Sequence, residues 1–189
     1  VVGKPEMLAL NPKDISKIDF INNPGVRYGD GIAYVINIVT RRNGSGYTVG
    51  TDLTSALTTL QGDDMVYGKW NKGKSELSFS YDVSGYKTKG EKSKQSAEYT
   101  LKDGSIYTIE RNDVESLRKS ISHDAKLTYN WADSTATVFQ ASLGGTFNNV
   151  PDNYTVKDIV DGTRQYKATS RAKDKSYSPV LDIYFFRQL

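Results

Sequence analysis

The sequence contains no cysteine in its 189 residues. This excludes a disulfide framework, a thiolate metal site and a thiol nucleophile. There is a single histidine, His123, and the acidic residues are dispersed along the chain. No set of side chains converges on a catalytic pattern, so we predict neither enzymatic activity, nor a catalytic metal, nor a cofactor.

The residues that come closest to a catalytic or metal-binding pattern have simpler explanations. Asp124 follows His123 at what we take to be the start of a strand, but no strained nucleophile turn accompanies the pair, which favours a surface or loop histidine. Asp30, Asp63 and Asp64 do not alternate as calcium ligands do, and we interpret them as hairpin-loop acids.

Long apolar runs are also missing, because no stretch approaches the roughly 18 residues of a membrane helix. The start, Val1 to Pro5, lacks the features of a signal peptide, so an exported parent would have lost its beginning. The net charge is only +3 and the lysines are scattered, so the sequence does not predict nucleic-acid binding. Mean hydropathy is −0.55, low for a compact enzyme.

The chain is rich in aromatic residues, with 13 Tyr, 2 Trp and 6 Phe, and its apolar and polar residues alternate in several segments. After a polar break at residues 41–46 the apolar residues recur with a period of two, which indicates strands with one wet face. From Glu76 to Val83 every apolar residue falls on one face. The same alternation recurs in Ala125–Trp131, Phe139–Phe147 and Leu181–Phe185.

The connections between these segments differ in length. Asn71–Lys74 and Ala132–Ser134 predict tight hairpin turns at one end of the sheet. Thr88–Ser120 and Asn149–Ser176 are much longer, and we expect them to be loops at the other end. A small hairpin is indicated within the first loop, around Lys102–Ser105. Sorted turns and loops are typical of transmembrane barrels.

The first forty residues have a different character. Asn11 and Pro12 predict a helix of one to two turns beginning near Pro12. Apolar segments around Ile18 and Phe20 and at Tyr34–Thr40 predict two strands. Turn residues at 22–25 and 28–31 separate them, so we expect a small α+β unit here.

One segment resembles a known family. The runs Ile18–Gly29 and Val35–Thr40 are similar to the junction between plug and barrel in TonB-dependent outer-membrane receptors, above all in the branch with Asn-Pro-Gly-x-Arg-Tyr-Gly. The specific likeness covers roughly residues 15 to 42; Ala33-Tyr34 and Asp19 depart from the usual pattern. The matching positions, all structural in role, are Asn23, Pro24, Gly25, Arg27, Tyr28, Gly29, Ile36, Asn37 and Thr40.

The resemblance implies a mainly β chain in which residues 1–42 end a plug domain and residues 43–189 form the first strands of an antiparallel, up-and-down barrel. We count about six strands where such receptors use about 22. It also implies active uptake of an unidentified nutrient (iron chelate, cobalamin, glycan or peptide), an energising TonB-type partner and an outer-membrane location with the short turns in the periplasm. Open strand edges would let the chain self-associate.

Under this interpretation the two faces of the strands meet different surroundings. Lipid would contact the rows Leu77, Phe79, Tyr81, Val83 and Leu127, Tyr129, Trp131, whereas Ser78, Ser80, Asp82, Thr128 and Asn130 would face the lumen or plug. Asn37, the polar side chain in its apolar strand, either satisfies backbone groups where plug meets wall or points to solvent. The alternative is a soluble β-sandwich-like binding or adhesion module, which would bury two such faces against each other.

Overall fold

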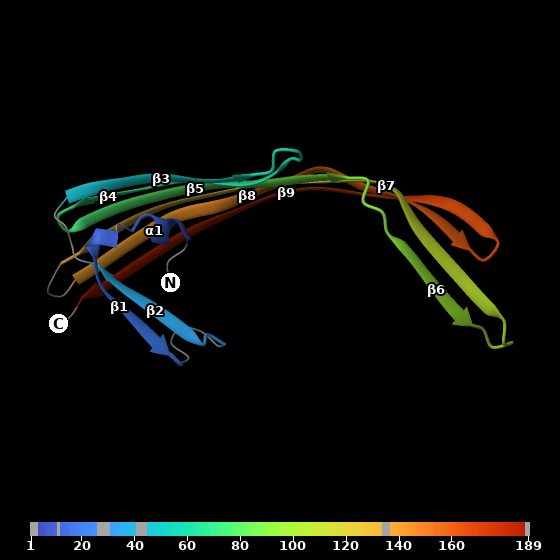
Figure 1. Cartoon of the computed structure of the whole chain (residues 1–189), viewed down its shortest axis with the longest axis horizontal. Helices are drawn as coiled ribbons and strands as arrows, with labels where there is room; N and C mark the ends of the chain where they lie inside the picture. Colours follow the sequence, from blue (N-terminus) through green and yellow to red (C-terminus); the bar gives the residue numbers. More distant parts are fainter. Residues whose placement is uncertain (1–3, 11, 26–30, 41–44, 134–136, 188–189) are drawn as a thin grey trace.

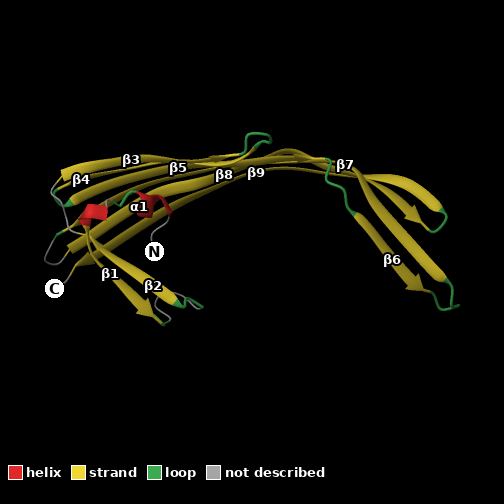
Figure 2. Ribbon diagram, viewed as in Figure 1, coloured by secondary structure: helices red, strands yellow, loops and turns green. Residues whose placement is uncertain are grey.

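A computed structural model describes residues 4–10, 12–25, 31–40, 45–133 and 137–187. Strands make up almost all of this part of the chain (Figure 2). The elements are α1 (Lys4–Leu8), a 3-10 turn (Pro12–Asp14), β1 (Ile15–Asn22), β2 (Tyr34–Thr40), β3 (Ser45–Ser55), β4 (Gln61–Lys72), β5 (Ser75–Lys89), β6 (Lys94–Thr100), β7 (Ile106–Ala132), β8 (Thr137–Asp161) and β9 (Arg164–Arg187).

Within the described residues the strands form two antiparallel sheets. β1 and β2 pair with each other, and the larger sheet has the order β3-β4-β5-β7-β8-β9, with β6 paired to β7. Strands that follow one another in the chain pair with each other in the larger sheet, except that β5 pairs with β7 instead of β6. This confirms a mainly β, antiparallel, up-and-down arrangement. The larger sheet is open. The switch between sheets falls between Thr40 and Ser45, and residues 41–44 lie outside the described part.

The two tight turns lie at the same end of the larger sheet, as predicted. Gly73 has a φ of 56° in the two-residue link between β4 and β5, a conformation that suits glycine. The carbonyl of Lys74 accepts a hydrogen bond from the Ala132 amide (3.1 Å), and the Lys74 ammonium pairs with Asp133 at 2.7 Å. Residues 134–136 of the second turn lie outside the described residues.

The prediction of long loops at the other end is wrong. Most of residues 88–120 and all of residues 149–176 except the tip at 162–163 belong to strands, which continue β5, β7, β8 and β9 as long hairpins. The expected small hairpin is present, since β6 pairs with β7 around the turn at Lys102–Ser105. Pro151 lies where the β8–β9 register shifts, one of the places where a strand accepts proline.

The N-terminal segment matches the prediction in order but not in length. A single 3-10 turn replaces the expected helix at Pro12, because β1 begins at Ile15, which pairs with Thr40. The short helix α1 was not predicted. The structure shows a helical turn and a hairpin here; that they form the end of a plug remains a prediction.

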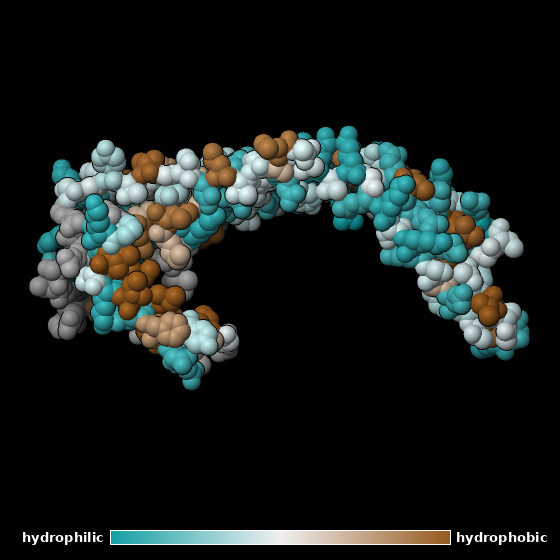
Figure 3. All heavy atoms as spheres, in the orientation of Figure 1, coloured by the Kyte–Doolittle hydropathy of each residue, from teal (hydrophilic) through white to brown (hydrophobic). Residues whose placement is uncertain are grey.

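The larger sheet is arched, and the N-terminal segment lies in its hollow (Figure 1). α1, β1 and β2 sit beneath the end that carries the tight turns, while β6 and the tips of β7, β8 and β9 form the opposite end. That far end is mostly hydrophilic on the face shown in Figure 3, which explains why its strands lack clean alternation. Along β9, nearly every side chain of this end from Arg164 to Lys175 is exposed.

Hydrophobic burial does not hold this sheet together. Among the described residues, Ala9 and Met65 are the buried hydrophobic side chains. The accessible surface is 14007 Å². A compact soluble protein of 21.0 kDa would expose about 9,000 Å² by the usual size scaling. The structure is a single curved layer, and one of its faces is apolar and uncovered.

Candidate functional site

The strand register collects apolar side chains on one face of the larger sheet, which we call the outer face. Residues directly opposite in antiparallel pairs point to the same side. Leu77 faces Tyr129, Phe79 faces Leu127, and both pairs continue across the sheet in unbroken register. The rows, taken from the tight turns upward, are Trp131, Phe139, Phe185; Tyr47, Trp70, Leu77, Tyr129, Ala141, Ile183; Val49, Gly68, Phe79, Leu127, Leu143, Leu181; Thr51, Val66, Tyr81, Ala125, Gly145, Pro179; and Leu53, Asp64, Val83, His123, Phe147, Tyr177.

Aromatic rings concentrate at the two ends of this band. Trp70, Trp131 and Tyr47 lie in the two rows nearest the tight turns, and Tyr81, Phe147 and Tyr177 lie in the two farthest rows. Leucines, valines and small residues fill much of the middle. Aromatic girdles above and below an aliphatic band are the arrangement of transmembrane barrels.

The dimensions and exposure of the band also fit a membrane. From Trp131 to Ile121 there are ten residue steps, roughly 33 Å along a strand. At a strand tilt of about 40° this gives a height of about 25 Å, the usual thickness of such a band. Its side chains remain open to the surroundings, with Leu143 58% and Leu181 68% exposed.

The opposite, inner face is polar and holds the N-terminal segment. Asp52, Ser80 and Thr128 belong to its rows, and Lys4 of α1 forms an ion pair with Asp52 at 2.6 Å. This hydrogen bond raises the pKa of the Lys4 ammonium. Because α1 lies in the hollow of the arch, the polar face is concave and the apolar outer face is convex (Figure 1).

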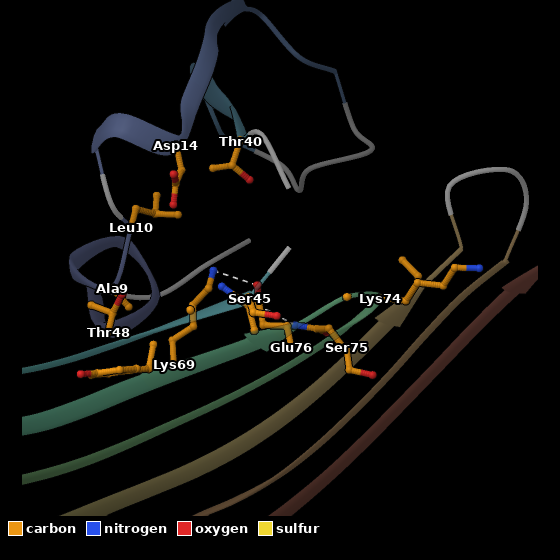
Figure 4. A pocket seen from close by; sticks show the side chains of 16 residues that line it. Ala9, Leu10, Asp14, Thr40, Ser45, Thr48, Lys69, Lys74, Ser75 and Glu76 are labelled. Atoms are coloured by element: carbon orange, nitrogen blue, oxygen red, sulfur yellow. Dashed lines mark hydrogen bonds and ion pairs between the residues drawn. The ribbon is translucent and has the colours of Figure 1, made fainter. Parts of the chain in front are cut away.

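A cavity of about 290 Å³ separates the N-terminal segment from the inner face near the tight turns (Figure 4). Ala9 and Asp14 line it from the N-terminal side and Glu76 from β5. The Glu76 carboxylate accepts from Lys69 at 2.8 Å and from Asn130 at 3.2 Å. The polar lining of the cavity suits water or a small polar solute.

The ion pair between Lys4 and Asp52 predicts that charge reversal loosens the N-terminal segment. In Asp52→Lys two ammonium groups would repel, and we expect faster amide hydrogen exchange across residues 4–10. Raising the salt concentration should narrow the difference from wild type, since exposed charges are screened. Asp174→Lys, a matched change far from α1, should leave exchange in residues 4–10 unaltered; equal effects from both variants would contradict a docking role for Asp52.

The residues of the junction motif are only partly within the described region. Asn23, Pro24 and Gly25 begin the link from β1 to β2, with left-handed backbone at Asn23 (φ 52°) and Gly25 (φ 72°). The Asn23 amide donates to the Ala33 carbonyl at 3.0 Å, closing the link. Ile36, Asn37 and Thr40 lie on β2. Arg27, Tyr28 and Gly29 lie outside the described residues.

Asn37 does not reach the backbone of the larger sheet. It is exposed, and its amide donates a long hydrogen bond of 3.5 Å to Asp19, its partner across the hairpin. This position fits the solvent-facing alternative, and a role where plug meets wall stays a prediction. The other face of the hairpin is apolar and open, with Phe20 63% and Ile36 61% exposed and the Tyr34 ring tilted against that of Phe20 at 5.2 Å between centroids.

His123, predicted as a surface or loop histidine, and Asp63 and Asp64, predicted as hairpin-loop acids, all lie inside strands. His123 is in the middle of β7, on the outer face, between the rings of Tyr81 and Phe147 and hydrogen-bonded to the Tyr81 hydroxyl at 2.7 Å. Asp64 is in β4, where it accepts from Ser55 and from the Thr54 amide at 3.1 Å. Asp63 also belongs to β4, and Asp30 lies outside the described residues. These groups tie neighbouring strands together.

No family model, curated protein or solved structure matches the chain in the comparisons. The assignment of a function therefore depends on the sheet itself. In the described ranges no helix is both long and apolar enough to span a membrane.

Sequence alternation was sufficient to find the outer face but not its upper edge. Beyond the apolar band, pairing between strands that are distant in sequence aligns lysines of β5, β7 and β9. Most of these lysines fall in residues 88–120 and 149–176, which the sequence predicted to be loops, and no local sequence pattern shows that they share a face.

Proposed function

We propose that this chain is part of an outer-membrane, TonB-dependent receptor for nutrient uptake, and that the larger sheet is a section of its barrel wall. The observation that carries this proposal is the uncovered apolar face: it is about 25 Å high, bordered by aromatic rows and convex. Such a face is suited to contact with lipid. The concave polar face would line the lumen.

The N-terminal segment supports the receptor assignment within the barrel class. A helical turn and the β1–β2 hairpin lie on the lumen side, held by Lys4 and separated from the wall by a polar cavity. Plug domains occupy this place in the family that the Ile18–Thr40 segment resembles. The open apolar side of the hairpin would pack against the remainder of such a plug, and a TonB-type protein would energise it.

The soluble β-sandwich alternative requires a second sheet packed on the apolar face. In the described part of the chain the β1–β2 sheet lies on the polar side instead, and Leu143 and Leu181 stay exposed. A sandwich of this size would also expose about 9,000 Å² rather than 14007 Å². The barrel wall accounts for both observations.

Spin labels on adjacent residues test the proposal, since the chain has no native cysteine to remove. In detergent micelles a label at Leu143→Cys on the outer face should collide mainly with oxygen, which concentrates in apolar phases. A label at Ser142→Cys should collide mainly with a water-soluble nickel chelate. Equal access of the chelate to both labels would contradict a lipid-facing outer surface.

A further inference from the structure

Basic side chains gather on the outer face just beyond the apolar band, at the end away from the tight turns. Pairing between β5 and β7 is regular from Ser75 to Lys89, and that between β8 and β9 is regular from Thr137 to Val150. Alternation along β5, β7 and β9 therefore assigns a set of basic residues to the same face as Leu77 and Phe147. This basic rim consists of Lys87, Lys89, Lys119, Arg171, Lys173 and Lys175.

Lys87 and Lys119 stand directly opposite each other in adjacent strands. Like charges in this position destabilise a sheet unless something neutralises them. Neither ammonium group forms an ion pair with any residue that the structure describes. Folding therefore places two cations side by side without an ion-pair partner in the part of the chain that the structure describes.

The remaining members extend this charge across the sheet. Lys175 is in register with Asn149 and, through it, with Ile121 at the upper edge of the apolar band. Arg171 lies over the ring of Tyr154 at 5.9 Å. Glu115, which alternation along β7 places on this face, accepts a hydrogen bond from the Tyr154 hydroxyl at 2.6 Å. Asp152 also acts electrostatically on this hydroxyl, so the cations of the rim outnumber the two carboxylates near Tyr154.

If the larger sheet is a barrel wall, the distance of the basic rim from the tight turns places it at the level of the lipid headgroups. Lys175 lies about 25 Å above the tight-turn end, where the hydrocarbon gives way to headgroups. Below it in the band are Phe147 and Tyr177, whose rings suit the upper part of acyl chains. A phosphorylated lipid has both a phosphate group that the rim could bind and acyl chains that the aromatic rings below could contact. A free anion would interact with the basic residues only.

We propose that the basic rim binds the phosphate groups of anionic lipid in the outer leaflet. The Lys87–Lys119 pair supplies the central cations, and the aromatic row beneath them contacts the acyl chains. This inference rests on the proposed function, because it needs lipid against the outer face. It adds a specific, headgroup-selective site to a surface that would otherwise bind any lipid.

Native mass spectrometry of the chain released from neutral maltoside micelles tests the site. With diphosphoryl lipid A added to the micelles, we expect bound lipid on the wild-type chain. Retention should be roughly tenfold weaker in Lys87→Gln/Lys119→Gln, a difference of about 1.4 kcal/mol, since the two central cations that attract anionic headgroups are removed. The control Lys102→Gln/Lys126→Gln removes the same charge from the β6–β7 turn and the inner face, and it should retain lipid as wild type does. Phosphatidylcholine should be retained weakly by all three proteins.

The outcomes separate this inference from the proposed function. If the Leu143→Cys label shows that detergent does not cover the outer face, the proposed function fails. If detergent covers that face but Lys87→Gln/Lys119→Gln holds lipid A as well as wild type, the rim is not its site. Displacement of lipid A by millimolar inorganic phosphate would also overturn the inference, because it would show a site for free anions.

Discussion

Leu143→Arg should be the most damaging single substitution on the outer face. Leu143 lies near the middle of the apolar band, between Leu127 and Leu181 in the same row, and its side chain is 58% exposed. An arginine facing lipid at that depth costs about 2–4 kcal/mol. We expect the free energy of unfolding in detergent micelles, measured by urea titration, to fall by that amount.

Ser142→Arg is the matched control for this prediction. The change introduces the same side chain one residue away, but on the polar face, directly opposite Asp182. Its guanidinium would remain in water and could pair with that carboxylate, so unfolding should shift by less than about 1 kcal/mol. Equal destabilisation by the two variants would mean that the faces do not differ in environment. A soluble sandwich would give a third pattern, with Leu143→Arg abolishing folding in the absence of detergent.

The sequence predicted those parts of the fold that depend on local alternation. Leu77, Phe79, Tyr81 and Val83 share a face because strand geometry places alternate residues on one side, and this holds before any partner strand is known. Gly73 and its neighbours gave the tight turn for the same local reason. Resemblance of the Ile18–Thr40 segment contributed the receptor hypothesis, which neither alternation nor composition contains.

The extensions could not be predicted in this way because they have no dry side. From Tyr154 to Val160 polar and apolar residues are mixed, as is natural when both faces of a hairpin meet water, so the pattern looked like a loop. The helix predicted near Pro12 is longer than the observed 3-10 turn, because pairing of Ile15 with Thr40 competes with helix formation. Such long-range pairing also creates the basic rim, since Lys87 and Lys119 are 32 positions apart in the printed sequence.

In water the chain should associate rather than remain a monomer. Two surfaces invite this: the apolar outer face, and the free edges of β3 and β9, which the described residues leave unpaired. An open strand edge presents a row of backbone donors and acceptors to another chain. Insertion into a bilayer is prohibitive in this state, because each unsatisfied backbone group in hydrocarbon costs several kcal/mol. A second copy can cover both surfaces at once.

Light scattering coupled to gel filtration should therefore give a mass well above 21.0 kDa in buffer and a smaller particle, after subtraction of detergent, in micelles. Leu181→Lys/Ile183→Lys places two charges on the outer face of the edge strand β9, and we expect it to shift the protein toward the monomer in buffer. Lys substitution of Ser176 and Ser178, which lie on the inner face of the same strand, should change the mass less. A monodisperse monomer that inserts into vesicles and admits solute would contradict this prediction, because it would mean that the sheet closes as a complete small barrel.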